Sequence, residues 1–471
     1  MFKYKFDLNG YLNKFKARLC VRGDLQTTEK DNYAATLAIR YFRTLMAMAA
    51  AFDLEIVQLD ALNAFLNSDI DEEITVDAPP GYPSHSKVLL LQKALYGLKQ
   101  APLLWHNYLT RILINLGLKS LPGINCVLAN DWMIFFFYVD DIILLYDKQN
   151  QSKFELFLAN LQGEIDLRLM DEANWFLGIR IIRDRPRRRL WLCQDSYIDK
   201  VLAKFNLKPY SKTQAFTPFT EGLEPFDGKA TADQIFAYQQ RIGTVNFVAV
   251  MTRPDVAKIC SILGQFLRNP GPRHLAAADR LISYLGRTKH LAIQYSNDVD
   301  DWDFDFKAYP LEIYSDAAFA DNTDRKSSDG YLFMLFGGPI DWKASKQTTV
   351  TTSSTEAELL ALSRTAKELI QWQRFFDRID FKVNARLSIL CDNAQTIRLL
   401  KQNGALLTTK LRHVDIHQHW LRQEVQQDKI DVEWVSTGEM KADGLTKPLP
   451  RQAFQRFIQQ LNLQSIQAMP L

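Results

Sequence analysis

Cysteine is scarce in this chain of 471 residues, and the cysteines form no pattern. The five that occur are odd in number and scattered: Cys20, Cys126, Cys193, Cys260 and Cys391. Neither a disulfide framework nor a zinc knuckle has such spacing, so we expect a reducing compartment.

Long apolar runs and a strong excess of one charge are also missing. No stretch approaches the roughly 18 apolar residues of a membrane span, and the basic, aromatic segment after Met1 lacks the apolar core of a signal peptide. A net charge of +3 permits nucleic-acid binding without predicting it. With 47% hydrophobic residues, the chain is typical of a globular protein inside the cell, and its length predicts two to four domains.

Three regions differ in pattern. Residues 1–190 combine strand-like stretches with amphipathic helices, and residues 191–305 are mostly helical with Pro and Gly punctuation. Residues 306–471 alternate strand, hairpin, helix, strand, helix, strand and helix, which indicates an α/β domain with a mixed sheet.

The adjacent acids Asp140 and Asp141 are the most informative feature of the first region. They lie between two strongly apolar runs, Trp132–Val139 and Ile142–Tyr146, where the chain must turn within a buried hairpin. Two like charges there repel each other and resist desolvation. A divalent cation with oxygen ligands accounts for them, because hard ions such as Mg²⁺ prefer carboxylates.

A third acid, Asp60, ends the strand-like segment that starts at Leu54. Alone it is explained equally well as a helix cap or turn residue. Together with the doublet it predicts a three-carboxylate site for two metal ions, which would activate a hydroxyl and stabilise a leaving phosphate.

In the segment Lys16–Arg22, Lys16, Arg18 and Arg22 project to one face and Ala17, Leu19 and Val21 to the other, which predicts a strand. Its basic face, with Lys16, Arg18 and Arg22, suits triphosphate or backbone phosphates. A solvated edge strand is the competing interpretation.

Four blocks together carry a family resemblance: Lys16–Leu19, Gln58–Asn67, Lys93–Pro102 and Tyr138–Asp141. In order and spacing they resemble the reverse transcriptase of copia-type long-terminal-repeat retrotransposons, over essentially the whole chain. The resemblance implies an α+β right-hand polymerase with fingers and palm in residues 1–190 and a thumb and connection in 191–305.

The resemblance also implies roles for single residues. Asp60, Asp140 and Asp141 would be the palm metal ligands. Phe65 would block a ribose 2′-hydroxyl, although a plain core aromatic is the alternative. Lys16, Arg18, Tyr96 and Gly97 would bind the nucleotide. The primer and template would contact Trp175, Phe176, Leu177 and Gly178.

The last region repeats the strand that ends on an acid, at Asp316 and at Asp392. Between them, Ser353 and Glu356 predict the start of a helix by a capping box. Glu358 lies on the apolar stripe of that helix, so we expect it to be buried with a partner or a metal; a glutamate snorkelling at the margin is the alternative.

A fourth acid, Asp443, precedes a final amphipathic helix. The set Asp316, Glu358, Asp392 and Asp443 resembles that of the ribonuclease H domain that follows the polymerase in the same family. The resemblance implies an α/β fold with a five-stranded mixed sheet in residues 306–471. Two metal ions would there activate a water and stabilise the leaving oxygen of an RNA phosphate.

Two basic features leave their roles open. The arginine-rich turn at residues 183–189 either contacts the template–primer backbone or is a solvated hairpin tip. His413, His417 and His419 have no nearby cysteine, which disfavours zinc and leaves a contact with the hybrid as the alternative.

Only fifteen residues precede Lys16, whereas the family's fingers begin well upstream. We find no aspartic-protease triplet, zinc knuckle or integrase head. The chain therefore resembles the C-terminal part of a Pol polyprotein or a genomic remnant. A cellular enzyme of the telomerase or group II intron type is disfavoured by the second acidic set.

The leading hypothesis is an RNA-directed DNA polymerase joined to a ribonuclease H, with two Mg²⁺ per active site and Mn²⁺ as a substitute. The expected partners are an RNA template, a DNA primer, the RNA–DNA hybrid, deoxynucleoside triphosphates and other Pol domains, but no membrane. We expect it in cytoplasmic virus-like particles and in the nucleus. The alternative is a catalytically inactive remnant that only binds nucleic acid.

Overall fold

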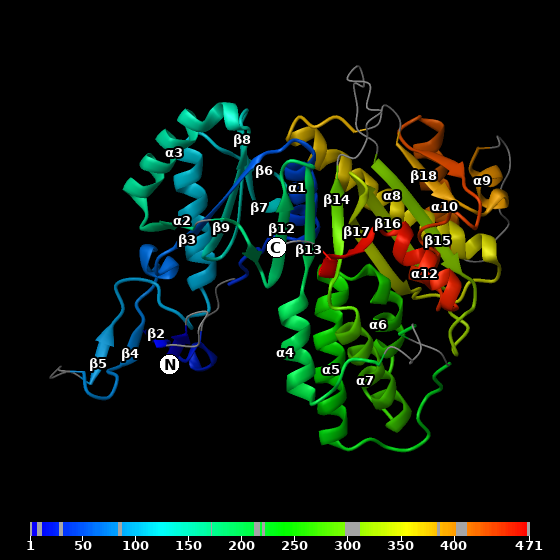
Figure 1. The fold of residues 1–471 in the computed structure, drawn as a ribbon, viewed down its shortest axis with the longest axis horizontal. Helices are drawn as coiled ribbons and strands as arrows, with labels where there is room; N and C mark the ends of the chain where they lie inside the picture. Colours follow the sequence, from blue (N-terminus) through cyan, green and yellow to red (C-terminus); the bar gives the residue numbers. More distant parts are fainter. Residues whose placement is uncertain are drawn as a thin grey trace. The chain divides into compact units, whose positions relative to one another are not determined.

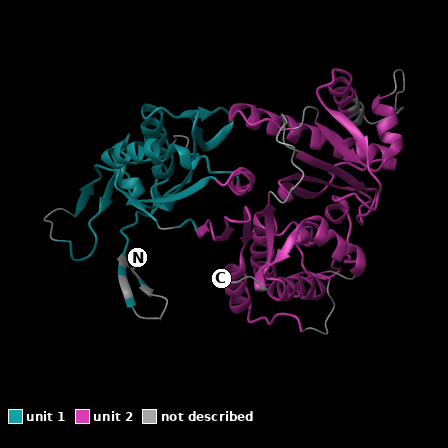
Figure 2. Ribbon diagram, turned by 45° about the horizontal axis from the view of Figure 1, so that its top comes forward, with its two compact units in different colours: residues 1–38, 54–173 teal, residues 39–53, 174–471 magenta. Residues whose placement is uncertain are grey.

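The computed structural model describes residues 2–6, 12–27, 32–82, 87–170, 172–211, 217–218, 222–296, 311–383, 387–401 and 412–468. It divides into two compact units, which Figure 2 colours separately. Unit 1 contains residues 1–38 and 54–173, and unit 2 contains residues 39–53 and 174–471. The three-domain division expected from the sequence stays a prediction.

Unit 1 is built around a six-stranded antiparallel sheet (Figure 1). Its strand order is β10 (Leu167–Leu169), β3 (Glu55–Ala61), β9 (Asp141–Tyr146), β8 (Met133–Tyr138), β7 (Ile124–Ala129) and β6 (Lys119–Leu121). The central strands β8 and β9 are buried on both faces, which explains their uninterrupted apolar sequence. Helices α2 (Ala101–Asn115) and α3 (Gln151–Glu164) pack against each other beside this sheet.

The rest of unit 1 consists of short elements. Two antiparallel pairs are present, β1 (Phe2–Phe6) with β2 (Leu12–Ala17), and β4 (Thr75–Asp77) with β5 (Val88–Leu90). The 3₁₀ turns are η1 (Gly23–Leu25), η2 (Ala64–Asn67) and η3 (Lys148–Asn150). The strand predicted over residues 16–22 is wrong beyond Ala17, because the backbone N–H of Val21 bonds to the carbonyl of Tyr96 (2.8 Å) instead of to a strand.

Helix α1 (Ile39–Ala51) belongs to unit 2, although unit 1 supplies the residues on both sides of it. It is buried from Tyr41 to Ala51 and packs against β13, β14 and β17. Its one buried charge, Arg43, donates hydrogen bonds to the carbonyls of Ile340 (2.9 Å) and Val250 (2.7 Å). Burial lowers the pKa of Arg43 to about 10, and the carbonyl contacts compensate part of the desolvation.

A five-stranded antiparallel sheet forms one layer of unit 2. Its order is β11 (Trp175–Phe176), β12 (Ile179–Asp184), β13 (Arg189–Cys193), β14 (Leu291–Ser296) and β20 (Leu463–Ser465). The last strand comes from the C-terminal end of the chain, so this sheet joins segments that are far apart in sequence.

A group of helices follows β13. It contains α4 (Asp195–Phe205), α5 (Ala232–Met251), η4 (Pro254–Val256), α6 (Ala257–Gly264) and α7 (Pro272–Arg287). Arg253 and Asp255, each 1% exposed, form a two-bonded ion pair (both bonds 2.8 Å). Tyr284 of α7 donates a further hydrogen bond to Asp255 (2.9 Å), so the pair fixes η4 against α7.

The second sheet of unit 2 is mixed and has five strands. Its order is β17 (Gly338–Lys346), β16 (Ser328–Leu335), β15 (Leu311–Ala318), β18 (Ser388–Cys391) and β19 (Asp431–Trp434). The first three strands are antiparallel, and β15, β18 and β19 are parallel. The associated helices are α8 (Ser354–Arg378), α9 (Ala394–Lys401), α10 (Arg412–Gln426), α11 (Asp443–Thr446) and α12 (Arg451–Gln460), followed by η5 (Ile466–Ala468).

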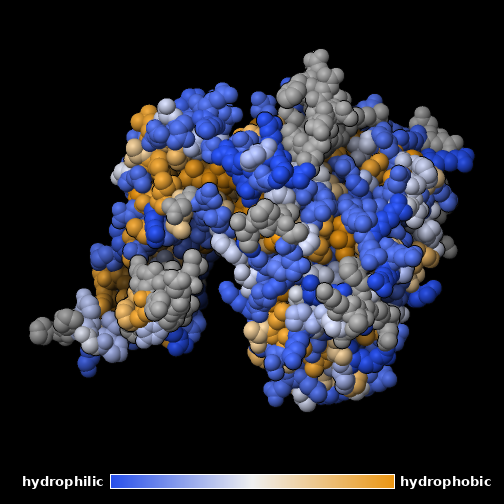
Figure 3. Space-filling model, viewed as in Figure 1, coloured by the Kyte–Doolittle hydropathy of each residue, from blue (hydrophilic) through white to orange (hydrophobic). Residues whose placement is uncertain are grey.

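The surface and the cysteines agree with the compositional expectations. All five cysteines are free thiols. Hydrophilic residues cover much of the visible face in Figure 3, with apolar areas between them. Among the described residues, none of the helices combines the length and the hydrophobicity that crossing a membrane requires.

Candidate active sites

The first candidate site lies in unit 1, at the hairpin between β8 and β9. Tyr138 pairs with Asp141, so Val139 and Asp140 form the turn. Val139 has a φ of 57°, which hairpin turns require but which costs a β-branched residue about 1–3 kcal/mol. Two hydrogen bonds hold the turn: Trp105 Nε1 donates to the Val139 carbonyl (2.7 Å), and the Ala61 N–H donates to the Asp140 carbonyl (3.0 Å).

The hairpin brings Asp141 opposite Asp60. The two residues are register partners in strands β9 and β3, so their side chains leave the same face of the sheet. Burial, followed by the charges of Asp140 and Asp60, raises the pKa of Asp141 to about 6. The charges of Asp140 and Asp60 therefore both act on Asp141, and a divalent cation relieves repulsion of this kind.

Phe65 and Tyr96 form an aromatic pair on which the charges of Asp140 and Asp60 act at Tyr96. Their rings meet edge to face with centroids 4.7 Å apart, and Phe65 is only 8% exposed. The guanidinium of Arg18 lies 5.4 Å from the centroid of the Tyr96 ring. Burial and then the charge of Asp140 raise the pKa of Tyr96, while Arg18 acts in the opposite direction. The structure thus places an aromatic pair, a cation and the aspartates together.

Gly97 allows two backbone segments to approach each other closely beside Tyr96. Its φ is +96°, and a Cβ at this position would lie 2.1 Å from the Val21 carbonyl oxygen. The close approach lets the segment that follows Arg18 lie directly against Tyr96–Gly97. Lys16 lies in β2, but its side chain is outside the described part of the structure.

The residues expected to contact the primer lie in unit 2. Trp175 and Phe176 form β11, and Leu177 and Gly178, both with positive φ, form the tight turn to β12. Trp175 is 43% exposed, whereas Phe176 is buried and its ring stacks on Phe42 of α1 at 5.0 Å. Trp175 and the turn are thus accessible to a ligand, and Phe176 is a packing residue.

Three arginines of the arginine-rich hairpin tip form ion pairs within the protein. Arg183 and Arg185 each bond to Asp53 at 2.9 Å, and Arg187 pairs with Asp184 at 2.8 Å. These pairs favour the solvated-tip interpretation for those three arginines, because their charges already have partners.

The second candidate site lies in unit 2, where Asp316, Glu358 and Asp392 come together. One carboxylate oxygen from each lies within 4.8 Å of the others, and within the described residues no other triple of potential metal ligands is as close. The parallel pairing of β15 with β18 places the two aspartates at neighbouring strand ends. Ser353 caps α8, as predicted, and Glu358 faces inward near its start.

Because this acidic set is buried, keeping its carboxylates charged costs free energy unless a cation is bound. Glu358 and Asp316 are each 4% exposed, and Glu358 Oε2 has no hydrogen-bond partner among the described residues. Burial and then the charges of Asp316 and Asp392 raise the pKa of Glu358 well above its ordinary value. For Asp316, burial is the main cause of a pKa of about 6. An orphaned buried oxygen within a set of hard oxygen donors fits a divalent metal ion.

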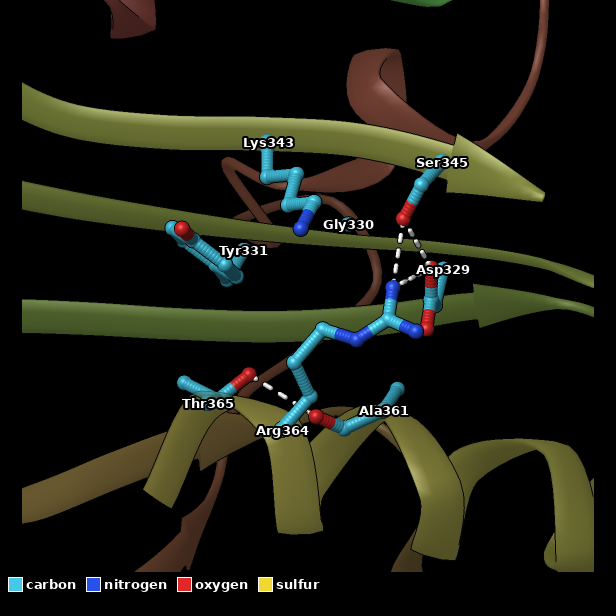
Figure 4. A pocket seen from close by; sticks show the side chains of 8 residues that line it. All are labelled: Asp329, Gly330, Tyr331, Lys343, Ser345, Ala361, Arg364 and Thr365. Carbon is cyan, nitrogen blue, oxygen red and sulfur yellow. Dashed lines mark hydrogen bonds and ion pairs between the residues drawn. The ribbon is translucent and has the colours of Figure 1, made fainter. Parts of the chain in front are cut away.

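Helix α8 is tied to the sheet by a polar cluster (Figure 4). Arg364 reaches from α8 to Asp329 of β16 (2.7 Å) and to Ser345 of β17 (2.5 Å), and Ser345 also donates to Asp329 (2.7 Å). Deeper on the same helix, Thr365 bonds to Ser315 of β15 at 3.0 Å. These contacts fix α8, and therefore Glu358, relative to the end of β15.

Asp443, the fourth expected acid, is not part of this close group of three, but its charge acts on Asp316. It begins α11, and burial is the main cause of its raised pKa, with the charge of Asp392 contributing. Two residues that our sequence interpretation missed lie beside it: the Thr446 hydroxyl donates a hydrogen bond to Asp316, and Lys447 Nζ lies 2.7 Å from Asp443 Oδ1. Their only sequence signal was their position within the Asp443–Lys447 segment.

Asp392 also has unforeseen neighbours. The Thr437 hydroxyl donates to its carboxylate at 3.0 Å, and the indole N–H of Trp434 donates to its backbone carbonyl at 3.2 Å. Both contacts follow from the pairing of Cys391 with Trp434 across β18 and β19. They position the carboxylate at the strand end.

The histidines of α10 form no metal centre within the described residues. His417 Nδ1 lies 2.9 Å from the Ser363 hydroxyl of α8, which gives it a packing role, and His419 is exposed. The His413 side chain is outside the described part.

Comparisons with known proteins find one family model and several relatives similar to this chain. Residues 1–220 match the family described as "Reverse transcriptase (RNA-dependent DNA polymerase)". The chain is 32% identical to the retrovirus-related Pol polyprotein from transposon TNT 1-94 of Nicotiana tabacum, over 97% of the chain and 34% of that protein. It is 31% identical to the corresponding protein from transposon RE1 of Arabidopsis thaliana, over 98% of the chain and 31% of that protein. The chain thus spans about a third of the length of these relatives.

Among solved structures, a foamy viral protease-reverse transcriptase in complex with double-stranded DNA is similar, with a TM-score of 0.46 and 14% identity. The similarity covers 83% of this chain and 59% of that one.

Proposed function

We propose that the chain is the reverse transcriptase/ribonuclease H region of a copia-type retrotransposon Pol polyprotein, and that it acts as an RNA-directed DNA polymerase joined to a ribonuclease H. The observation that carries the proposal is the presence of two separate acidic sets. Asp60, Asp140 and Asp141 lie at one sheet of unit 1, and Asp316, Glu358, Asp392 and Asp443 lie at another sheet of unit 2.

In unit 1, the three aspartates would hold divalent cations, which we propose to be two Mg²⁺ that Mn²⁺ can replace. When bound, such ions lower the pKa of an attacking hydroxyl and stabilise charge on phosphate. The protein's own residues would do the positioning: Arg18 and Lys16 bind the triphosphate, Tyr96 and Gly97 shape the nucleotide pocket, and Phe65 closes the space that a ribose 2′-hydroxyl needs. Trp175 and the Leu177–Gly178 turn would support the primer.

In unit 2, the acidic set would hold the same kind of cation, again as a pair, and would cut the RNA strand of the hybrid. Thr446 and Thr437 orient Asp316 and Asp392 through hydrogen bonds, so the carboxylates are held in place before substrate arrives. We propose fingers and palm in residues 1–190, thumb and connection in 191–305 and the ribonuclease H domain in 306–471. The substrates would be an RNA template, a DNA primer, deoxynucleoside triphosphates and the RNA–DNA hybrid.

The test uses the purified chain with an RNA template, a DNA primer and Mg²⁺, and follows nucleotide incorporation and hybrid cleavage separately. Asp140→Asn should abolish incorporation and preserve cleavage, and Asp392→Asn should do the reverse. Matched controls are Asp147→Asn, which lies one residue beyond β9 and caps η3, and Asp324→Asn, which is 44% exposed.

Two results would contradict the proposal. Loss of both activities in either variant, with the fold intact, would show that the two sites are not separate. Binding of template–primer without incorporation at any Mg²⁺ or Mn²⁺ concentration would instead support the alternative of an inactive remnant that only binds nucleic acid.

A further inference from the structure

Among the described residues, Lys447 carries a positive charge directly beside the second site. Its Nζ lies 2.7 Å from Asp443 Oδ1, and its side chain remains 43% exposed, whereas that of Asp443 is 19% exposed. The charge of Lys447 acts on Asp443, Asp316 and Glu358, and lowers the pKa of each against the larger effect of burial. The ammonium of Lys447 therefore contacts Asp443 and acts electrostatically on Asp316 and Glu358.

The pairing occupies an oxygen that a metal ion needs. Asp316, Glu358 and Asp392 each place a carboxylate oxygen within 4.8 Å of the others, and the charge of Asp443 acts on Asp316. These charges repel each other, and burial removes the water that would otherwise screen them. A lysine stem is flexible and its head is strongly hydrated, so an ammonium that is nearly half exposed can leave the carboxylate for water. Thr446, the residue before it, is in contrast buried and fixed to Asp316.

On the premise of the ribonuclease H site proposed above, we propose that Lys447 is a positioning residue that acts as a counter-ion: it holds Asp443 when no metal is bound and gives this carboxylate up when a divalent cation binds. Lys447 and the cation then compete for the same oxygen. If Lys447 competes with the cation, removing its ammonium group should strengthen metal binding. If Lys447 only stabilises the structure of the site, removing it should weaken metal binding.

The chain offers a matched control a few residues away. Lys441 Nζ lies 2.6 Å from Glu312 Oε2, with 23% and 40% of the two side chains exposed. This is a second lysine–carboxylate pair of unit 2 in which one partner is also partly buried, here the lysine, and its carboxylate is not part of the acidic set. Lys441→Met therefore loses a comparable ion pair without freeing a metal ligand.

The experiment measures the binding of Mn²⁺ and of Mg²⁺ alone by calorimetry, without nucleic acid. All proteins carry Asp140→Asn and Asp141→Asn, so that the site of unit 1 does not contribute. Lys447→Met should lower the apparent dissociation constant about 3- to 10-fold, the range expected from losing a partly exposed ion pair with further carboxylates nearby. Lys447→Arg should not tighten binding, because it keeps the pair, and Lys441→Met should leave the constant unchanged.

A double variant shows whether the effect passes through Asp443. In an Asp443→Asn background, Lys447→Met should change the metal affinity less than twofold. The side chain at position 443 is then uncharged, so Lys447 and the cation no longer compete for it. The two changes are therefore expected to be non-additive. If Lys447→Met does not fold, Lys447→Arg and Asp443→Asn still test the competition through their own dissociation constants.

Unchanged or weaker metal binding in folded Lys447→Met would overturn the inference, as would equal effects of Lys447→Met and Lys441→Met. Failure of the proposed function would give a different result. The parent chain would bind metal, and Lys447→Met would tighten this binding as expected, but the parent chain would not cut the RNA–DNA hybrid.

Discussion

Asp60 of β3 and Asp141 of β9 are directly opposed partners in the central sheet of unit 1. Antiparallel partners point to the same face, so the pairing joins a lone strand-terminal acid to the aspartate doublet. The position of Asp140 is fixed differently, by the turn that Trp105 and Ala61 hold through the backbone. The geometry of the first site therefore depends on strand register and on the support of one strained turn.

The first prediction concerns that support. Trp105→Phe removes the indole donor to the Val139 carbonyl and keeps most of the buried aromatic volume. We expect DNA synthesis to fall about tenfold, corresponding to ~1.4 kcal/mol of transition-state stabilisation, because Asp140 loses its fixed position. Hybrid cleavage should not change. Tyr108→Phe on the same helix is the control, and equal loss in both variants would refute the positioning role.

The second prediction tests Phe65 as the residue that excludes ribonucleotides. Phe65→Val opens space beside Tyr96, and we expect the preference for deoxynucleotides over ribonucleotides to fall by about 10- to 200-fold. Single-nucleotide incorporation with matched ribo- and deoxynucleotides measures the ratio. Because Phe65 is 8% exposed, thermal unfolding must accompany the assay. A destabilised variant with unchanged discrimination would show that Phe65 is only a core aromatic.

The third prediction is a pH dependence of the metal-free protein. The pKa of Asp316 is about 6 when folded, against an ordinary value of 3.8. Between these values the folded state binds more protons than the unfolded state, so the free energy of unfolding falls as the pH rises through roughly 4 to 6. Asp141, also with a pKa of about 6, acts in the same direction.

Asp316→Asn removes the Asp316 part of this loss. At pH 7.5 with a chelator, we expect the variant to be more stable than the parent by about 1–3 kcal/mol in urea unfolding, and the difference to vanish near pH 4. Mg²⁺ should stabilise the parent at pH 7.5 more than at pH 5. If the free energies of unfolding of variant and parent differed by the same amount at pH 7.5 and near pH 4, the raised pKa would not belong to Asp316.

The fourth prediction concerns the buried pair of Arg253 and Asp255. Asp255→Ala leaves a buried guanidinium without its carboxylate, and we expect a loss of about 3–5 kcal/mol in the free energy of unfolding. Arg187→Ala breaks the exposed pair with Asp184 and should cost less than ~1 kcal/mol. Urea unfolding of both variants measures the contrast, and similar losses would show that burial does not set the cost.

Local signals in the sequence were sufficient for many elements of both sites. The apolar runs around Asp140 predicted the β8–β9 hairpin, and the Ser353 cap predicted the start of α8. The inward position of Glu358 followed from helical periodicity. These features succeed because hydrogen bonding and side-chain direction repeat over a few residues, so that a short segment contains them.

What only the tertiary structure decided are relationships between distant segments. Helix α1 joins unit 2 although its sequence neighbours lie in unit 1, and β20 pairs with β14 at the edge of another sheet. Nor does any local pattern place Lys447 on Asp443 or Thr446 on Asp316. Periodicity says which face of a segment is apolar, whereas its partner depends on how all such faces pack together, and that is a property of the whole chain.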